Sequence, residues 1–283
     1  MPLRTLARRL TSKQVHSQAA DLFGRAMLSR TARLPADVAN LRPKSAVDLH
    51  SIFSDSGIRE AWEADCAAVL DAWPISSGKG SVNKGDCRAI YYLISALKPE
   101  RIIEIGTNVG RSTAFIATAI RSACPSAGLT TVDIVDVNAA DGPWSQGGQM
   151  TKAPTEYLKD FGLADKVKFV KSTALDYFAR EPEADLIFLD GSHAHHDVYQ
   201  EVSAALKALR KGGMILLHDF YPGGKPLFKN SLPLMGPYRA MERFCRERAP
   251  ITVLPFGDLP WPTRGKQHAS SLALVLRSTD SHD

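Results

Sequence analysis

Short apolar runs alternate with longer segments of helical period between residues 101 and 276. The apolar runs predict seven strands, at 101–105, 129–133, 167–170, 185–190, 213–218, 251–254 and 271–276. The segments between them predict helices at 112–122, 154–161, 175–180, 197–209 and 237–248. Because strands that alternate with helices form parallel sheets covered on both faces, we expect an α/β fold with a mainly parallel seven-stranded sheet.

Two further helices are predicted before the first strand. A helix at 58–73 carries its large apolar residues at spacings that share one face, and Pro74 with a following glycine cluster ends it. A second helix at 86–97 ends before another proline. We therefore divide the chain into an N-terminal basic arm and helical extension, residues 1–80, and a sheet domain, residues 81–283.

The formal net charge of +5 comes from the first 36 residues. Seven basic side chains there stand against one acid, Asp21, which gives +6 for the arm and leaves about −1 for the rest. A basic charge confined to the arm argues against a nucleic-acid substrate. We interpret the arm as a solvated helix that packs on the domain or on a partner subunit; an Arg-rich, acid-poor start is also typical of an organellar transit peptide.

The composition is that of a globular enzyme. Apolar residues make up 44% of the 283 positions, and no apolar run approaches the roughly 18 residues that a membrane-spanning helix requires. The four cysteines form no CxxC pair, so the sequence indicates neither a zinc knuckle nor a disulfide framework. Reduced thiols favour a cytoplasmic protein.

The first chemical motif is Arg101-Ile-Ile-Glu-Ile-Gly-Thr-Asn-Val-Gly110, a strand that turns directly into a helix. Glycines in such a turn let the backbone approach a ligand, and the helix start presents free N–H groups. The spacing is G-x-x-x-G and differs from the G-x-G-x-x-G of dinucleotide-binding folds, which disfavours pyrophosphate binding. The turn therefore predicts a small-molecule cradle.

Two later strand ends carry polar side chains suited to a nucleoside. Asp133 ends the second strand, where a carboxylate can accept hydrogen bonds from two ribose hydroxyls, and Asp136 is the competing candidate. Ser172 and Thr173 end the third strand, where either hydroxyl can cap the helix that follows.

The fourth and fifth strands deliver the strongest candidates for catalysis. The stretch Ala184-Asp-Leu-Ile-Phe-Leu-Asp-Gly-Ser-His193 places Asp190 and His193 at a strand end, and Lys211-Gly-Gly-Met-Ile-Leu-Leu-His-Asp219 does the same for His218 and Asp219. Successive strand residues point to opposite faces, so we expect Asp219 to face the substrate and His218 to be a hydrogen-bonded, half-buried residue.

Together these motifs resemble class I S-adenosylmethionine-dependent methyltransferases, in particular small-molecule and sugar O-methyltransferases of the macrocin type. The resemblance covers residues 84–277 and implies a Rossmann-like fold with S-adenosylmethionine as cofactor. Glu104 would then act through the loop or on the ligand's ammonium group. The implied cofactor-binding residues are Glu104, Gly106, Asn108, Gly110, Ser112, Asp133, Ser172, Thr173 and Asp190.

For catalysis the resemblance implies Asp190, His193 and Asp219. The two carboxylates lie on neighbouring strands and would repel each other unless bridged, so we expect them to hold a divalent cation such as Mg²⁺. Phe220 stands where related metal-dependent enzymes have a second acid or an amide, which weakens this metal site. His193 can act as the general base.

Several alternatives remain open from the sequence. His195 and His196 are further base candidates, or they open the next helix with Asp197. The Gly/Pro-rich loops 138–148 and 221–236 are candidate substrate lids or plain connections. The helical arm and segment 256–262 are candidate homodimer surfaces.

We expect O-methylation of a small hydroxylated acceptor, such as a sugar, a glycosylated natural product or a catechol. Two competing hypotheses are a nicotinamide-dependent oxidoreductase and a non-catalytic nucleotide-binding protein of the same fold.

Overall fold

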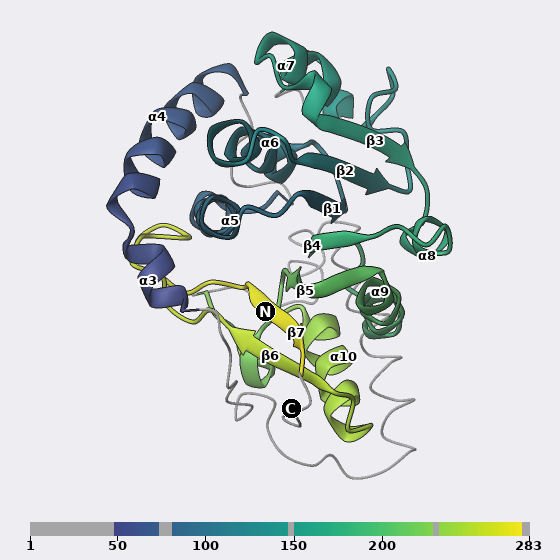
Figure 1. Ribbon diagram of the computed structural model, residues 1–283. Helices are drawn as coiled ribbons and strands as arrows, with labels where there is room; N and C mark the ends of the chain where they lie inside the picture. The colour runs from purple at the N-terminus through teal and green to yellow at the C-terminus, as the bar shows by residue number, and fades with distance from the viewer. Residues whose placement is uncertain (1–47, 74–80, 147–149, 229–231, 279–283) are drawn as a thin grey trace, which may run out of the picture.

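A central seven-stranded sheet organises the protein, as described by a computed structural model for residues 48–73, 81–146, 150–228 and 232–278. The strand order is β3-β2-β1-β4-β5-β7-β6 (Figure 1). Neighbouring strands run parallel from β3 to β5, and β7 is antiparallel to both β5 and β6. The strands are β1 (Arg101–Ile105), β2 (Gly128–Asp133), β3 (Val167–Lys171), β4 (Ala184–Leu189), β5 (Leu209–Leu217), β6 (Ile251–Pro255) and β7 (Ala273–Arg277). The predicted mainly parallel α/β sheet is confirmed.

Helices cover both faces of this sheet. They are α3 (Leu49–Ser54), α4 (Ser56–Ala72), α5 (Lys84–Leu97), α6 (Arg111–Ala123), α7 (Pro154–Asp160), α8 (Ala174–Phe178), α9 (His195–Ala208) and α10 (Met235–Arg246), with 3-10 turns at Pro143–Gln146, Ala164–Lys166 and Pro222–Gly224. Helices α4, α5 and α6 lie on one face, and α8, α9 and α10 lie on the other (Figure 1). Within the described residues no helix is both long and apolar enough to cross a membrane.

The two-residue period of the strands divides the buried side chains between two hydrophobic clusters. Ile102 packs with α5 and α6, while its neighbour Ile103 packs with α8 and α9. Leu186 and Ile187 divide in the same way on β4. Strands that are apolar at every position are therefore buried on both faces, as a parallel sheet requires.

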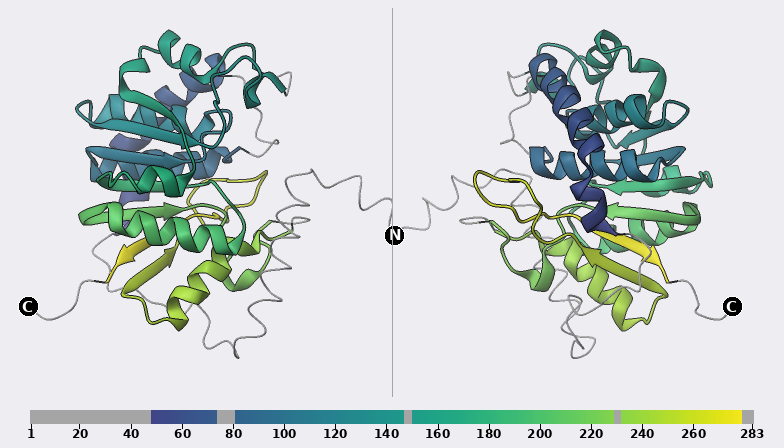
Figure 2. Two further views of the ribbon diagram at one scale, coloured as in Figure 1. Left: turned by 90° about the vertical axis from the view of Figure 1, so that its right-hand side faces the viewer. Right: turned by 60° about the vertical axis from the view of Figure 1, so that its left-hand side comes forward.

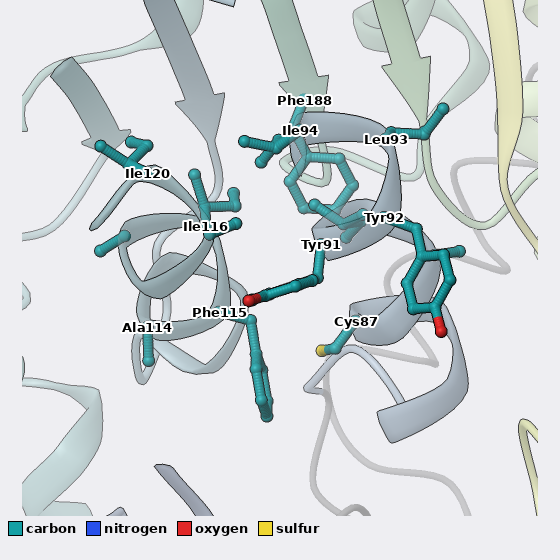
Figure 3. Packing of buried hydrophobic residues seen from close by; sticks show 14 of the residues in the cluster. Cys87, Tyr91, Tyr92, Leu93, Ile94, Ala114, Phe115, Ile116, Ile120 and Phe188 are labelled. Carbon is teal, nitrogen blue, oxygen red and sulfur yellow. The ribbon is translucent and has the colours of Figure 1, made fainter. Parts of the chain in front are cut away.

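The first face is built from large side chains of α5 and α6 (Figure 3). Tyr91 and Phe115 are fully buried there, and Phe188 reaches them from β4. Trp62 of α4 packs on both aromatic neighbours, with ring centroids 5.3 Å from Tyr91 and 5.0 Å from Phe115. Helix α4, drawn in purple, crosses the outside of this layer (Figure 2, right). The described part of the N-terminal extension thus shares one core with the sheet.

Two details differ from the sequence-based expectations. The short helix α3 was not predicted; the Asp48 side chain caps it, and Phe53 is its buried residue. Strands β4 and β5 each end one residue earlier than predicted, so Asp190 and His218 lie in the loops that follow. The basic arm at residues 1–36 lies outside the described residues.

Candidate active site

The turn between β1 and α6 contacts the end of β4. Gly106 has a φ of +99°, and a β-carbon at this position would overlap the backbone carbonyl of Asp190. Asn108 also has a positive φ, of 50°, and Gly110 begins α6 in the left-handed conformation. Only glycine meets both the φ and the close approach at position 106, so the turn and the Asp190 loop are packed backbone against backbone.

Glu104 lies directly beneath this turn and is fully buried. The hydroxyls of Ser112 and Thr113 donate to its carboxylate at 2.6 and 2.5 Å, and Thr131 donates at 2.7 Å. Burial raises the pKa of Glu104 to about 7, although these three hydrogen bonds lower it. Glu104 therefore ties the turn and α6 to β2 from below, and Ser112 shares that internal contact.

Asp133 ends β2 next to the turn, with both carboxylate oxygens directed at backbone groups. The Asn108 N–H donates to it at 2.9 Å and the Val135 N–H at 3.2 Å. The competing acid Asp136 is exposed and accepts from the Asn138 N–H at 3.0 Å, which closes a local turn. Asp133 is therefore the acid that lies against the glycine turn.

The end of β3 lies beside the end of β2. The Ser172 N–H donates to the carbonyl of Asp133 at 2.8 Å. Thr173 caps α8, because its hydroxyl accepts from the Asp176 N–H at 3.1 Å and donates to the Asp176 carboxylate at 2.7 Å. The Thr173 hydroxyl is thus engaged in the cap, whereas the contact of Ser172 with Asp133 is made by its backbone N–H.

Asp190, His193 and Asp219 converge where β4 and β5 end. One potential ligand atom of each lies within 4.8 Å of the other two. His193 Nε2 lies 2.9 Å from Asp219 Oδ2 and 4.0 Å from Asp190 Oδ1. The three side chains that were expected at this edge of the sheet do lie together. The imidazole of His193 lies between the two carboxylates.

His218 completes this arrangement, in a position that differs from the expected one. Its Nδ1 lies 2.8 Å from Asp190 Oδ1 and 3.8 Å from Asp219 Oδ1. The expectation that His218 and Asp219 point to opposite faces is wrong, because the strand ends at Leu217 and Asp219 takes a φ of +53°. His218 is hydrogen-bonded as expected, but it is buried where a half-buried residue was expected.

The neighbouring carboxylates and imidazoles shift the pKa values of His218 and Asp219. Burial lowers the pKa of His218, but Asp190 and Asp219 outweigh it and hold that pKa well above its ordinary value. Burial alone would raise the pKa of Asp219; His218 and His193 instead keep it well below its ordinary range. The cluster therefore carries anionic carboxylates whose mutual repulsion is offset by imidazole.

The loop that carries Asp190 and His193 is held from α9 and α10 as well. A β-carbon on Gly236 of α10 would overlap the carbonyl oxygen of His193. The Ser192 hydroxyl donates to Asp197 at 2.8 Å in the first turn of α9. His195 and His196 lie in that same turn, as one of the two sequence interpretations expected. They are not part of the three-residue cluster.

The donor set fits a divalent cation held by two carboxylates and one imidazole. Phe220 is fully buried and adds no ligand, so the third candidate donor is His193. Carboxylate oxygens suit Mg²⁺ and Mn²⁺, whereas an imidazole nitrogen is a better ligand for transition metals such as Fe²⁺ and Zn²⁺. The cluster therefore fits a transition metal at least as well as the expected Mg²⁺.

Residues 103–220 match a family model described as a methyltransferase domain. The match begins in β1 and ends just after Asp219, so it contains both the glycine turn and the acidic cluster. Residues 103–220 therefore form a methyltransferase domain. A comparison with curated proteins gives no match.

Solved structures share the fold of this chain. Rv0187 from MTB, described as cofactor-bound, is 20% identical with a TM-score of 0.53; the match covers 84% of this chain and 100% of that one. The O-methyltransferase TomG from Streptomyces achromogenes, in complex with SAM, is 18% identical with a TM-score of 0.52, over 95% of this chain and 100% of that one. At such identities the similarity concerns the fold.

Sequence reasoning missed one buried acid of the methyltransferase site, Asp86 in the first turn of α5. Its carboxylate is fully buried, and His218 Nε2 lies 3.5 Å from it. The available signal was its spacing: Asp86, Ile90 and Ile94 are four residues apart and share the buried face of the predicted helix. The two loops proposed as lids are described only in part, since 147–149 and 229–231 lie outside the described residues.

Proposed function

We propose that this methyltransferase transfers the methyl group to a hydroxyl oxygen of a small acceptor, such as a sugar or a catechol-like compound, with a divalent cation held by Asp190 and Asp219. The observation that carries the proposal is the position of the Asp190–His193–Asp219 cluster. Its loop packs directly against the Gly106 turn, so acid, base and cofactor cradle share one edge of the sheet.

S-adenosylmethionine, when bound, supplies a methyl group on a sulfonium that is open to in-line attack. We expect the backbone of Gly106, Asn108 and Gly110 to line its methionine and ribose side. Asp133 is the expected acceptor for the ribose hydroxyls, because it stands at the strand end next to this turn. Glu104 would act from beneath, through the loop, since all of its described partners are internal hydroxyls.

The acceptor must lose a proton as its oxygen attacks the methyl group. His193 is placed for this role because its Nε2 faces the carboxylate of Asp219, which would stabilise the imidazolium that forms. Asp190 is held by His218 on the far side, so its orientation is fixed before the acceptor enters. We expect this preorganisation to hold the base and the carboxylates around the acceptor hydroxyl.

The cation, when bound, would polarise the acceptor oxygen and lower the pKa of its hydroxyl. Asp190 and Asp219 would hold it, and His193 would be either its third ligand or the base. A vicinal pair of hydroxyls on the acceptor would complete the oxygen shell. The cluster thus favours an acceptor with adjacent hydroxyls.

The test is a methyl-transfer assay over a panel of sugars, catechols and polyketide glycosides, read by mass spectrometry. We expect turnover on at least one diol, loss of turnover with EDTA, and recovery when Mg²⁺ or Mn²⁺ is restored. Asp219→Asn should abolish this recovery, whereas Asp136→Asn, in an exposed turn, should behave as the wild type. Turnover that EDTA leaves unchanged would exclude the cation.

Calorimetric titration separates the competing functions. We expect binding of S-adenosylmethionine and S-adenosylhomocysteine and none of NAD. Tight binding of NAD with no methyl transfer would support an oxidoreductase instead, and cofactor binding without any turnover on the panel would favour a non-catalytic protein.

A further inference from the structure

Asp86 is a fully buried carboxylate that the chemistry above does not use. Asn83 Nδ2 and Ser270 Oγ each donate to it at 2.6 Å, and Ser271 Oγ lies 3.3 Å away. Even where donors surround a buried charged group, its replacement by apolar residues of similar volume is often neutral or stabilising. The position therefore calls for a reason beyond packing.

Capping of α5 is not that reason. Asn83 already caps the helix, because its side-chain oxygen accepts from the Asp86 N–H at 2.9 Å. The Asp86 side chain points instead into the protein, toward the end of β5 and the segment that precedes β7.

His218 lies between Asp86 and the catalytic edge. Its Nδ1 is 2.8 Å from Asp190 Oδ1, and its Nε2 is 3.5 Å from Asp86 Oδ2. Its ring is buried beside Phe188, with centroids 6.1 Å apart. Among the described residues Nε2 has no hydrogen-bond partner, so Asp86 acts on the ring as a charge partner at this distance, and a carboxylate behind Nε2 favours the ring orientation that turns Nδ1 toward Asp190.

We propose that Asp86 is a positioning residue of the methyl-transfer reaction, which holds the His218 ring so that it fixes the carboxylate of Asp190. Only the expected effect on methyl transfer rests on the proposed function; the positioning of His218 by Asp86 does not. The contacts lead from Asp86 on α5, through His218 after β5, to Asp190 after β4. Ser270 and Ser271, which precede β7, also contact Asp86. Partners of this kind, one step removed from the reacting groups, typically change activity 10- to 100-fold when lost.

The test combines ring NMR of ¹⁵N-histidine protein with steady-state kinetics on Asp86→Asn. We expect the His218 ring nitrogen signals to shift, kcat to fall about 10- to 100-fold, and KM for S-adenosylmethionine to stay within about 3-fold. Asp65→Asn is the matched control. Asp65 accepts from the Tyr91 hydroxyl of α5 at 2.6 Å, away from the active site, so His218 signals and kcat should not change.

The wild type gives a second measurement that needs no variant to fold. The Hε2 proton of His218 should appear as a protected downfield resonance, and its absence would overturn the inference. Unchanged His218 signals in Asp86→Asn would overturn it too, even with methyl transfer intact. Shifted signals in a protein with no methyl transfer would support the positioning of His218 while refuting the proposed function.

Discussion

Glu104 makes a quantitative prediction about stability because its carboxyl is buried and uncharged donors surround it. Its pKa rises from the ordinary 4.5 to about 7 in the folded state. Between these two values the folded protein binds a proton that the unfolded chain has released, so this group makes stability fall as pH rises. A tenfold change in proton affinity corresponds to about 1.4 kcal/mol, which makes the full loss about 3 kcal/mol.

Glu104→Gln removes the titration while keeping the volume and one acceptor oxygen. We expect the variant to gain about 2–3 kcal/mol of unfolding free energy relative to the wild type between pH 5 and pH 8. Urea unfolding at both pH values, followed by circular dichroism, measures this difference directly. Other titrating groups cancel, since they are present in both proteins.

Parallel pH curves for wild type and Glu104→Gln would refute the reasoning, because they would mean that the three hydroxyls compensate fully for burial. The same variant also decides how Glu104 serves the cofactor. Affinity for S-adenosylmethionine should change no more than a few fold if Glu104 acts only from beneath the turn. A loss of 100-fold would show that it contacts the ligand's ammonium group instead.

Three further substitutions test the site. Asp133→Asn should weaken S-adenosylmethionine binding about 10- to 100-fold in calorimetry, since charge-assisted hydrogen bonds contribute about 1.5–3 kcal/mol each; unchanged affinity would exclude its ribose role. Thr173→Ala should cost about 1 kcal/mol of stability by loss of the cap and leave cofactor affinity intact. Gly236→Ala should displace the His193 carbonyl and lower kcat more than cofactor affinity, whereas Gly128→Ala, which meets open space, should be silent.

The fold could be predicted from the sequence because the central strands β4 and β5 carry apolar residues on both faces and are bounded by turn residues. The carboxyl-edge rule for parallel strands then placed Asp190 and Asp219 side by side before any coordinates. The register of β4 on β5 confirms that proximity, with Leu189 opposite Leu217. These predictions need only the local pattern of apolar and turn residues, which a single sequence contains.

The positions of His218 and Asp86 could not be predicted in this way. Strand alternation puts His218 and Asp219 on opposite faces, and only the positive φ of Asp219 brings both toward Asp190. The spacing of Asp86 puts it on the buried face of its helix but does not show its partners, because one hydroxyl that donates to it belongs to Ser270, 184 positions later. Contacts at such separation depend on how the sheet closes, and no local pattern encodes them.

Gly106 shows why binding and catalysis are difficult to separate in this fold. The sequence suggests a glycine there for approach to a ligand, yet its nearest neighbour is the Asp190 backbone. Any residue with a β-carbon would push β4 and its loop away, and the loop cannot retreat because Gly236 packs against His193 from the opposite side. The turn at Gly106 and the loop that carries Asp190 therefore form one rigid unit, and a displacement of either one displaces the other.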